Sequence, residues 1–484
     1  MRWTTWALAG ALGGTTALLG CTSQPMSTAD SGPGMPDARA GDAGTMEDAG
    51  SMPDAGADAG PTDSGAPIDA PMERMPPELT AAERAVIATL SPLPDVPPDT
   101  TNAVADDPRA AALGHALFFD ARYSGPLAVT SDLGMMGEAG RVSCASCHSS
   151  EVMSDDRSMP DNVSLGANFH TRNAPAIVNS AFYRWTNWGG RFSAQWELPP
   201  VVAESPVIMN SSRLQIAHHI FDNYREEYEA IFGAMDPALS DLARFPATGR
   251  PVAMGMPAGP WEMMSATDRD IVLEIFTNYG KAIQAYQRQL ISRDAPFDRF
   301  VAGDEDAIGV SAQWGLRLFI GMARCVTCHS GPQFSDDEFH NLWIPQTGEH
   351  VPMTDTGRYS SIPALLSSSL NSAGLWSDDP AAGMARLAGL TMTPPEATRG
   401  AFRTPTLRGV AASAPYMHSG QLATLEGVIE LYDQGGGATP IVGERSSHLF
   451  PLHLTAQDRE DLLAFLLALT GEPVPEALRS APTD

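Results

Sequence analysis

The sequence predicts a mostly α-helical protein with two domains and long loops. Three observations support this prediction. Several segments place apolar residues at helical spacing, and no segment shows the strict alternation of a half-buried β-strand. One short motif, Cys-x-x-Cys-His, occurs twice, at residues 144–148 and 325–329. Because the copies lie about 180 residues apart, we expect one domain around each motif, with a boundary near residue 300.

The first 20 residues are predicted to be an export signal. Arg2 supplies a positive charge, an apolar run extends from Trp6 to Leu19, and Cys21 directly follows Gly20. That ending is typical of a lipoprotein signal, in which the cysteine is lipidated and becomes the new N-terminus. The apolar run contains Gly and Thr and is short for a bilayer span, which disfavours a transmembrane anchor. We therefore expect an exported protein that faces the periplasm or the cell surface, with the lipid on Cys21 held in a membrane.

Residues 21–76 are predicted to be a disordered tether. They consist mainly of Asp, Ala, Gly, Pro, Ser and Met, with almost no aromatic or branched side chains. Such a segment cannot bury enough apolar surface to offset the entropy lost on ordering. The folded part then comprises residues 77–300 and 301–484, one domain for each copy of the motif.

Helical periodicity places helices in both domains. Thr80 and Glu83 form a capping box at the start of the first helix, and Thr455 caps the last. Residues 233–264 contain several Pro, Gly and Met residues and are predicted to be an irregular insertion. After the signal, no segment is long and apolar enough to cross a bilayer. The predicted helices cover residues 80–90, 107–120, 211–232, 267–290, 311–322 and 456–469.

Each copy of the motif is typical of a covalent attachment site for a c-type haem. The two cysteine sulfurs form thioethers with the haem vinyl groups, and the adjoining histidine becomes an axial ligand of the iron. Zinc-binding and thioredoxin-like alternatives are disfavoured by the histidine in both copies, the export signal and the absence of a third ligand pair. The sequence therefore predicts two covalently bound haem c groups and redox chemistry. The attachment residues are Cys144, Cys147 and His148 for the first haem and Cys325, Cys328 and His329 for the second.

The net charge of −28 bears on the choice of partner. The part of the chain after the tether is also acidic, which argues against a nucleic-acid partner. A basic redox partner, such as a small c-type cytochrome, would suit this charge. Acidity that simply keeps an exported protein soluble explains the composition equally well. No cysteine is left for a structural disulfide, so haem binding and core packing are expected to hold the fold together.

Beyond the two motifs, the chain contains a series of short segments with distinctive sequences. They are Leu113–Asp120, Val142–His148, Arg172–Pro175, Asn187–Arg191, Gly321–Pro332, Phe402–Arg408 and Ala414–Gly420. In sequence and order they resemble the bacterial dihaem cytochrome c peroxidase and MauG family, from about residue 105 to 470, so the resemblance covers the whole folded part. It implies two cytochrome c-like haem domains, in which the N-terminal haem reacts with hydrogen peroxide and the C-terminal haem receives and relays electrons.

The resemblance also assigns roles to residues between the two haems. Trp188 matches the tryptophan that carries electrons between them, although without the family an aromatic residue beside two glycines is more often a packing residue. A calcium ion is also implied, bound by the side chain of Asn173 and the backbone carbonyls at the positions of Ser413 and Pro415. By itself, Asn173 would be an ordinary turn residue.

The resemblance implies that Tyr432 is the sixth ligand of the second haem. Peroxidases of the family have a methionine fourteen residues after the histidine of the Pro-Tyr-x-His motif, here His418, whereas MauG-type members have a tyrosine. This count reaches Tyr432. A phenolate oxygen is a hard anionic donor that stabilises oxidised iron better than a thioether does, so the second haem would have a low potential. The alternative is a core tyrosine on a helix that begins near Thr424.

The sequence departs from the family near the first haem. Peroxide cleavage needs a group that moves a proton between the two oxygens. The family places a glutamine ten residues and a glutamate twenty residues after the relay tryptophan. Leu198 and Ile208 occupy these positions, and neither side chain can transfer a proton.

Two other groups are candidates for the proton step. Glu204, and Glu197 with it, lies close in sequence, so a shifted carboxylate can substitute for the missing one. His170 lies three residues after Ala167, which occupies the position that the resemblance gives to a distal histidine. The alternative for His170 is an exposed loop histidine.

Two hypotheses of function follow. The first is an exported dihaem oxidoreductase that reduces hydrogen peroxide at the first haem, with electrons from a c-type cytochrome or another oxidisable substrate. The second is a non-catalytic electron-transfer cytochrome whose pocket at the first haem has degenerated. Leu198 and Ile208 favour the second hypothesis, whereas both haem motifs and Trp188 fit either. The sequence leaves open whether the protein forms a homodimer.

Overall fold

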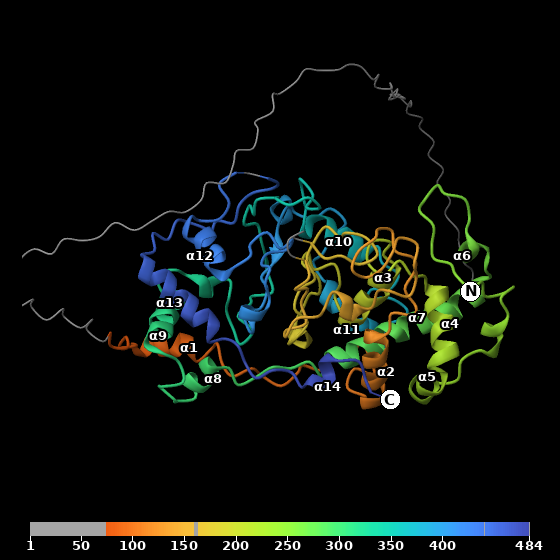
Figure 1. Ribbon diagram of the computed structural model, residues 1–484, viewed down its shortest axis with the longest axis horizontal. Coiled ribbons are helices and arrows are strands. Elements are labelled where there is room, and N and C mark those ends of the chain that lie inside the picture. The colour runs from red at the N-terminus through yellow and green to blue at the C-terminus, as the bar shows by residue number, and fades with distance from the viewer. Residues whose placement is uncertain (1–73, 159–162, 440, 484) are drawn as a thin grey trace, which may run out of the picture. The chain divides into compact units, whose positions relative to one another are not determined.

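Helices joined by long loops make up most of the described chain (Figure 1). The computed structural model describes residues 74–158, 163–439 and 441–483. Within these residues the strands are a single antiparallel pair, β1 (Phe339–His340) and β2 (Phe402–Arg403). The prediction of a mostly α fold is therefore confirmed. The predicted export signal, the lipidated Cys21 and residues 21–73 of the tether lie outside the described residues.

The observed helices include every helix that the sequence predicts. The segment predicted as one helix over 211–232 is two helices that meet at Tyr224, where φ is −138° and ψ is 23°. No helix in the described ranges is long and apolar enough to cross a membrane. The helices before residue 302 are α1 (Ala81–Ile87), α2 (Pro108–Phe119), α3 (Leu198–Glu204), α4 (Arg213–Asn223), α5 (Arg225–Phe232), α6 (Pro260–Met263), α7 (Ala266–Gln287) and α8 (Pro296–Val301). The later helices are α9 (Val310–Ile320), α10 (Arg358–Leu366), α11 (Pro380–Leu387), α12 (Leu425–Asp433), α13 (Ala456–Leu467) and α14 (Glu476–Arg479).

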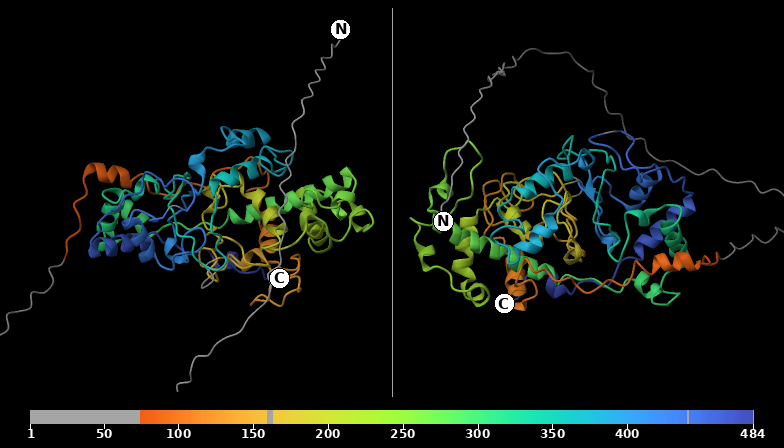
Figure 2. Two further views of the ribbon diagram at one scale, coloured as in Figure 1. Left: turned by 90° about the horizontal axis from the view of Figure 1, so that it is seen from above. Right: turned by 180° about the vertical axis from the view of Figure 1, so that it is seen from behind.

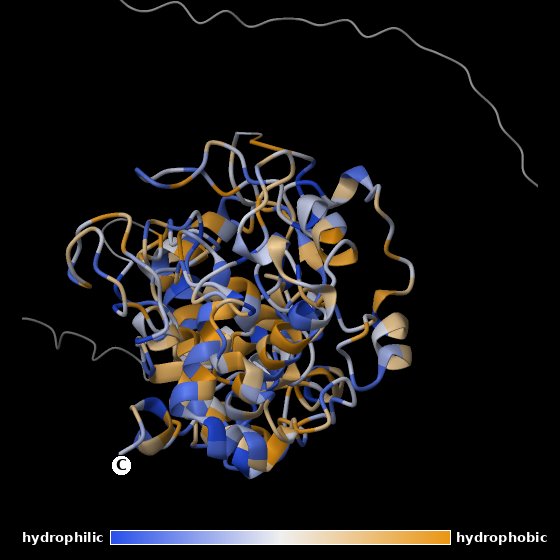
Figure 3. Ribbon diagram, turned by 90° about the vertical axis from the view of Figure 1, so that its right-hand side faces the viewer, coloured by the Kyte–Doolittle hydropathy of each residue, from blue (hydrophilic) through white to orange (hydrophobic). Residues whose placement is uncertain are grey.

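Two hydrophobic cores organise the described residues. In the first core, α2 packs against α7, and Leu117 and Phe118 lie in one cluster with Phe276. In the second core, α9 packs against α13, and the rings of Phe319 and Phe465 lie 5.1 Å apart. Figure 3 shows the apolar residues concentrated where helices pack together. Burial of these side chains is the main term that stabilises each core.

A glycine permits a close helix crossing in each core. A Cβ atom at Gly114 of α2 would lie 1.9 Å from the carbonyl oxygen of Ala282 in α7. A Cβ atom at Gly315 of α9 would likewise lie 1.9 Å from the carbonyl oxygen of Asp461 in α13. The helices can approach this closely only because glycine has no side chain. In both cores, the helix with the glycine is the one that precedes a Cys-x-x-Cys-His motif.

Each core also includes a segment from the other end of the chain. Ile87 and Leu90, near the N-terminal side, belong to the second core, and α1 lies beside α9 (Figure 2). Val474, near the C-terminus, belongs to the first core, where Tyr286 donates a hydrogen bond to the carbonyl oxygen of Leu478. The predicted domain boundary near residue 300 stays a prediction, because both cores contain residues from either side of it.

Candidate haem centres and the residues between them

The two Cys-x-x-Cys-His motifs share one local conformation. In each motif the first cysteine begins a 3₁₀ turn and the second cysteine caps the end of that turn. The Nδ1 atom of His148 lies 2.7 Å from the carbonyl oxygen of Met153, and the Nδ1 atom of His329 lies 2.8 Å from that of Phe334. Met153 and Phe334 have positive φ angles, 54° and 51°, which few side chains other than glycine adopt. The same strained turn therefore holds the histidine ring at both motifs.

This hydrogen bond prepares each histidine to bind a metal. An imidazole that donates its Nδ1 proton to a backbone carbonyl is held in one orientation and keeps Nε2 available as the ligand atom. Burial also lowers the pKa of His148 and of His329, which favours the neutral form that coordinates iron. Both histidines thus fit the role of axial haem ligand.

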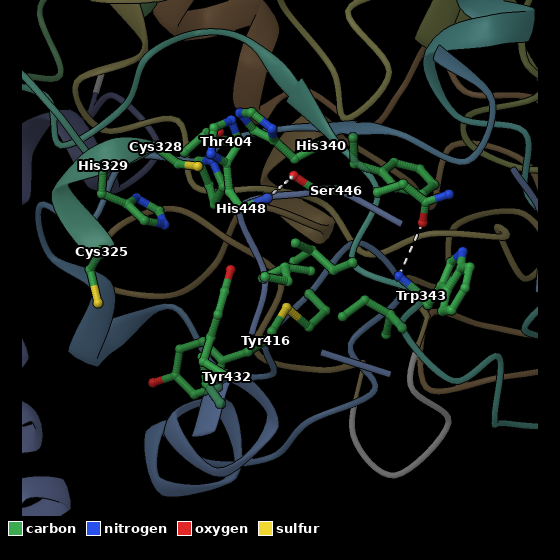
Figure 4. A pocket seen from close by; sticks show the side chains of 18 of the residues that line it. Cys325, Cys328, His329, His340, Trp343, Thr404, Tyr416, Tyr432, Ser446 and His448 are labelled. Carbon is green, nitrogen blue, oxygen red and sulfur yellow. Dashed lines mark hydrogen bonds between the residues drawn. The ribbon is translucent and has the colours of Figure 1, made fainter. Parts of the chain in front are cut away.

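A large cavity adjoins the second motif (Figure 4). Its empty volume is about 1740 Å³, the space at its mouth included. Cys325, Cys328 and His329 line one side of it, and Tyr416 and Tyr432 line another. Most of the remaining wall is apolar. Two sulfurs, an imidazole and an apolar wall around one cavity fit a haem that is bound through thioethers. The other apolar lining residues include Phe319, Leu425, Ile429, Leu462 and Leu466.

Tyr432, on α12, turns its hydroxyl into this cavity (Figure 4). Within the described residues, no hydrogen-bond partner of this hydroxyl is found. Burial raises the pKa of Tyr432 above its usual value. A hydroxyl that faces the cavity without a protein partner is free to coordinate a metal ion held there. The prediction of Tyr432 as a ligand is consistent with this arrangement and stays a prediction.

His340 is a charged residue at the same cavity that sequence reasoning did not identify. Its Nε2 atom lies 2.9 Å from Oδ2 of Asp336. Hydrogen bonds with Asp336 and then Cys328 raise the pKa of His340 to about 10, so that the ring is protonated at neutral pH. The spacing of Asp336 and His340 is the only sequence signal for this pair. A protonated histidine here would stabilise a negative group at this edge of the cavity.

The first motif lies in the first core. The sulfur of Cys144 interacts with the hydroxyls of Tyr123 and Tyr279, and Sγ of Cys147 lies 3.6 Å from the carbonyl oxygen of Leu165. Burial raises the pKa of both cysteine thiols to about 12. The two sulfurs and the prepared imidazole of one motif fit thioether attachment of a haem at this position too.

Trp188 lies between the two motif regions. Its side chain lines the cavity at the second motif. Its indole N–H donates a hydrogen bond of 2.7 Å to the carbonyl oxygen of Asn173. Its own carbonyl oxygen accepts a hydrogen bond of 2.8 Å from the backbone N–H of Arg403. These contacts hold the indole in one orientation between a segment that follows the first motif and a segment that follows the second.

The loop that carries Trp188 has a counterpart in the second half of the chain. An isolated bridge closes the Trp188 loop from Thr186 to Phe192, and another closes the loop from Tyr416 to Leu422. In the first loop Asn187 has a φ angle of 71°, and in the second Met417 has a φ angle of 72°. His418 therefore occupies the position in the second loop that Trp188 occupies in the first. Burial lowers the pKa of His418 to about 3, so its ring is neutral.

Two of the groups predicted to bind calcium, the Asn173 side chain and the Pro415 carbonyl oxygen, are hydrogen-bonded to each other. Nδ2 of Asn173 donates to the carbonyl oxygen of Pro415 over 3.3 Å, and Oδ1 accepts a bond of 3.1 Å from the hydroxyl of Ser164. The Asn173 amide is therefore satisfied without an ion. Its contacts add no support for calcium, which stays a prediction.

The two apolar residues at the expected acid–base positions have structural places in the fold. Leu198 is the first residue of α3. Ile208 is half-buried and packs against the first core, and its carbonyl oxygen accepts a hydrogen bond of 2.6 Å from the N–H of Ala167. Neither side chain offers a proton.

The two nearby carboxylates both have partners, an ion pair in one case and hydrogen bonds in the other. Glu204 forms an ion pair with Arg213, with contacts of 2.9 Å and 2.7 Å to its two oxygens. Glu197 is buried and accepts hydrogen bonds from Ser193 and from the backbone N–H of Ser372. Burial raises the pKa of Glu197 to about 7. Neither carboxylate can take part in a proton transfer without giving up these partners.

His170 is the candidate with an uncommitted atom. Nδ1 of His170 contacts the backbone of Arg172 at both its carbonyl oxygen, over 3.2 Å, and its N–H, over 3.1 Å, so that Nε2 is left for another partner. Burial lowers the pKa of His170 and keeps the ring neutral. The loop that contains it begins beside Cys147, because Leu165 is the residue whose carbonyl meets that sulfur. His170 lies in a loop, as the alternative has it, but its side chain is half-buried rather than exposed.

Comparison with known proteins identifies similar chains. The family model for the di-haem cytochrome c peroxidases matches residues 108–306. The chain is 32% identical to the cytochrome-c peroxidase IdrP1 of Denitromonas iodatirespirans, over 81% of this chain and 88% of that protein. It is 30% identical to the methylamine utilization protein MauG of Methylorubrum extorquens, over 78% of this chain and 82% of that protein.

Solved structures give the same result for the fold. The crystal structure of a MauG-like protein associated with microbial copper homeostasis matches with a TM-score of 0.52 and 26% identity. That match covers 81% of this chain and 97% of the other. The diheme peroxidase BthA of Burkholderia thailandensis has the same fold at 19% identity, with a TM-score of 0.54 over 80% of this chain and 93% of its own.

Proposed function

This chain belongs to the dihaem cytochrome c peroxidase and MauG family, and from that premise we propose that it reduces hydrogen peroxide at its first haem with electrons relayed through its second. As a family member it is a peroxidase-like oxidoreductase with two haem cofactors. When bound, the two haems supply redox-active iron for peroxide reduction and electron transfer. The protein residues hold, orient and connect the haems and supply the proton step.

The position of Trp188 is the observation that carries this proposal. Its indole borders the second haem cavity and is hydrogen-bonded to Asn173, on the segment that leads back to the loop beside Cys147. An electron relay needs an oxidisable group held close to both centres, and an indole in a fixed orientation meets that need. Trp188 acts in this proposal as the bridge for electrons.

His329 and Tyr432 are the proposed ligands of the second haem. They line the same cavity, and the Tyr432 hydroxyl has no other partner in the described chain. Coordination would require the phenol to lose its proton, which the metal makes possible despite the raised pKa of Tyr432. A phenolate lowers the reduction potential of the iron that it binds, because it stabilises the oxidised form.

His170 is the proposed proton donor and acceptor at the first haem. When its Nδ1 donates to the carbonyl oxygen of Arg172, the Nε2 lone pair is free to accept a proton. The neutral ring can then take a proton from one oxygen of hydrogen peroxide and, as imidazolium, return it to the leaving oxygen. Glu204 remains a second candidate, but only if its ion pair with Arg213 opens.

The proposed partners follow from charge and export. The net charge of −28 suits a basic electron donor such as a small c-type cytochrome, and argues against a nucleic acid. The lipid proposed on Cys21 would keep the protein at a membrane surface outside the cytoplasm. The calcium ion proposed near Asn173 enters no step of the reaction.

A non-catalytic electron-transfer cytochrome is the second candidate function. The observation that favours it is the lack of a free carboxylate at the expected positions. Glu204 is paired with Arg213, and apolar Ile208 replaces the expected glutamate. Such a protein would pass electrons between partners through Trp188 without reacting with peroxide.

A steady-state assay separates the two functions. The protein with both haems is mixed with a reduced small c-type cytochrome and hydrogen peroxide, and oxidation of the cytochrome is followed by absorbance. Catalysis predicts oxidation that depends on peroxide and stops when the peroxide is consumed. The electron-transfer alternative predicts no dependence on peroxide in the wild type, with activity gained in the variant Ile208→Glu.

A further inference from the structure

An unbroken series of aromatic side chains leads away from the first haem-attachment motif on the side of Cys144. The sulfur of Cys144 interacts with the hydroxyls of Tyr279 and Tyr123, which lie 3.0 Å from each other. The ring centroid of Tyr123 lies 5.4 Å from that of His219, and the centroid of His219 lies 5.7 Å from that of Tyr224. We call Tyr279, Tyr123, His219 and Tyr224 the aromatic chain.

The aromatic chain runs from the core to the surface. Tyr279 and Tyr123 are each 1% exposed, and the side chain of His219 is 10% exposed. Tyr224 is half-buried, at the junction where α4 ends and α5 begins. Cys144 would hold the first haem through a thioether, so the aromatic chain would connect that attachment point to solvent through successive ring contacts.

Tyr224, the tyrosine at the outer end of the aromatic chain, has a carboxylate as its proton acceptor. The hydroxyl of Tyr224 donates a hydrogen bond of 2.9 Å to Oδ2 of Asp120. Burial acts to raise the pKa of Asp120, but hydrogen bonds from His219 and Arg122 outweigh it and hold the pKa well below its usual range. The carboxylate is therefore ionised and can accept the phenolic proton when Tyr224 loses an electron, because an oxidised phenol is a strong acid.

The inner tyrosines lack such an acceptor. The hydroxyl of Tyr123 donates to the carbonyl oxygen of Leu117 over 2.8 Å, and a carbonyl is not a base that takes up a proton. An oxidised Tyr123 would therefore keep its proton and be an unfavourable place for the charge. The inner rings serve as a bridge for electrons, and Tyr224 is the residue on which the oxidised state is most stable.

The surface around Tyr224 suits a flat, neutral aromatic donor. The guanidinium of Arg122, whose side chain is 60% exposed, lies 5.8 Å from the centroid of the Tyr224 ring. The guanidinium of Arg225, whose side chain is 42% exposed, lies 4.7 Å from the ring of Phe221. Each guanidinium is also paired with a carboxylate, Arg122 with Asp120 and Arg225 with Glu229, so this surface offers planar groups for stacking rather than free charge.

We propose that Tyr224 is a second entry point for electrons, through which small phenolic donors reduce the first haem without using the second. This inference rests on the proposed function, because hydrogen peroxide is the oxidant. In each transfer, Tyr224 passes one electron along the aromatic chain and its proton to Asp120. A phenol at the surface then gives one electron to oxidised Tyr224, which takes its proton back from Asp120; the phenol releases its own proton to solvent and leaves as a phenoxyl radical. Two such transfers supply the two electrons that, with two protons taken up from solvent, convert one hydrogen peroxide to two water molecules.

Radical trapping followed by peptide mass spectrometry tests this inference. The protein with both haems is mixed with hydrogen peroxide and a nitrone spin trap, without any donor, and the tryptic peptides are searched for trap adducts. We expect an adduct on Tyr224 that is lost in the variant His219→Leu, which removes a ring from the aromatic chain. The matched control is His218→Leu, the neighbouring histidine on α4, whose Nε2 atom contacts the carbonyl oxygens of Phe245 and Pro246 instead.

Tyr359 provides an internal reference in the same digest. It is also half-buried and has an arginine over its ring, with Arg399 at 3.8 Å, but it has no ring contact with another aromatic residue in the described part of the chain. The inference predicts an adduct on Tyr224 and little on Tyr359. Equal labelling of the two tyrosines would mean non-specific oxidation and would overturn it.

Peroxide consumption in the same samples separates this inference from the proposed function. Consumption without an adduct on Tyr224, or an adduct that persists in His219→Leu, would overturn the second entry point and leave the proposed function standing. Absence of any peroxide consumption by the wild type would refute the proposed function and this inference with it. Haem content, measured from the absorbance of each variant, shows that the substitutions have not disturbed the first centre.

Discussion

Trp188 donates its indole N–H to the carbonyl oxygen of Asn173 over 2.7 Å, and the same indole borders the cavity at the second haem motif. One hydrogen bond therefore ties the proposed electron bridge to the segment after the first motif. The orientation of the ring depends on this bond, because the other polar contacts of Trp188 are made by its backbone.

Replacement of Trp188 by phenylalanine should slow electron transfer between the haems. A phenyl ring is much harder to oxidise than an indole and cannot donate to Asn173. We expect a decrease of at least about tenfold, which corresponds to about 1.4 kcal/mol in activation free energy. Stopped-flow absorbance after rapid reduction of the second haem measures the rate.

The matched control for that experiment is Trp185→Phe. Trp185 lies three residues earlier, is 4% exposed and packs against the guanidinium of Arg358. If both variants slow transfer equally, the effect comes from loss of packing, and Trp188 is not the bridge.

Replacement of Tyr432 should change the potential of the second haem. In Tyr432→Met a neutral thioether takes the place of the phenolate, so the reduction potential should rise by on the order of 0.1 V, within the range of about 0.8 V that axial ligands span. Spectroelectrochemical titration measures it. Tyr416→Phe is the control, because Tyr416 lines the same cavity but donates its hydroxyl to Val410. An unchanged potential in Tyr432→Met would show that Tyr432 is a core tyrosine.

Replacement of His170 should remove the proton step. His170→Gln keeps a polar side chain without a titratable ring, and the rate of reaction with peroxide should fall by about 100-fold or more. His350→Gln is the matched control, since His350 stacks on Phe169 in the adjacent position, with centroids 3.5 Å apart. Introduction of Ile208→Glu into the His170→Gln variant should restore part of the rate. An unaffected rate in His170→Gln would assign the step to another group, with Glu204 the first to examine.

Glu197 should make the stability of the fold depend on pH. Burial raises its pKa from 4.5 to about 7. A carboxyl group with a raised pKa binds its proton more tightly in the folded state, so stability is highest below pH 4.5 and is lost as the pH rises to about 7. The full loss is about 3 kcal/mol. Urea unfolding at pH 5 and pH 8 should therefore show a decrease for the wild type that is absent from Glu197→Gln. Equal decreases in the two proteins would contradict this assignment.

The helix crossing near the second motif should not tolerate a side chain. In Gly315→Ala the new Cβ atom would lie 1.9 Å from the carbonyl oxygen of Asp461, so α9 and α13 must move apart. We expect a loss of about 1–3 kcal/mol in the free energy of unfolding. Gly309→Ala, at the start of the same helix, is the control, because nothing lies within 4 Å of its Cβ position. Thermal unfolding followed by circular dichroism compares the two variants.

The features that could be predicted from the sequence alone are those that depend on residues close together in the chain. The haem motifs, the capping box of Thr80 with Glu83 and the cap at Thr455 all depend on residues within one turn, and the structure has the caps as predicted. The long amphipathic helices were predicted for the same reason. The short helices α3, α6, α8, α10, α11 and α14 were not predicted, because a few turns with proline in or near them carry little periodic signal.

The contacts that decide the chemistry of the site lie beyond the reach of local patterns. Glu204 was a reasonable proton donor in the sequence, but Arg213, on the next helix, pairs with it. The partner of Gly114 is Ala282, and His219 meets Tyr123, both far along the chain. Such pairs form when helices cross, and a single sequence carries no record of which residues the crossing brings together.

The reaction with one equivalent of hydrogen peroxide, followed in a stopped-flow spectrometer on protein carrying two oxidised haems, separates peroxide reduction from electron transfer alone. We expect a rapid change in the haem absorbance of the wild type and a much slower one in His170→Gln. We also expect added reduced cytochrome to reverse the change through the second haem. No spectral change, either in the oxidised protein or after reduction of one haem, would contradict peroxide reduction and leave an electron-transfer cytochrome.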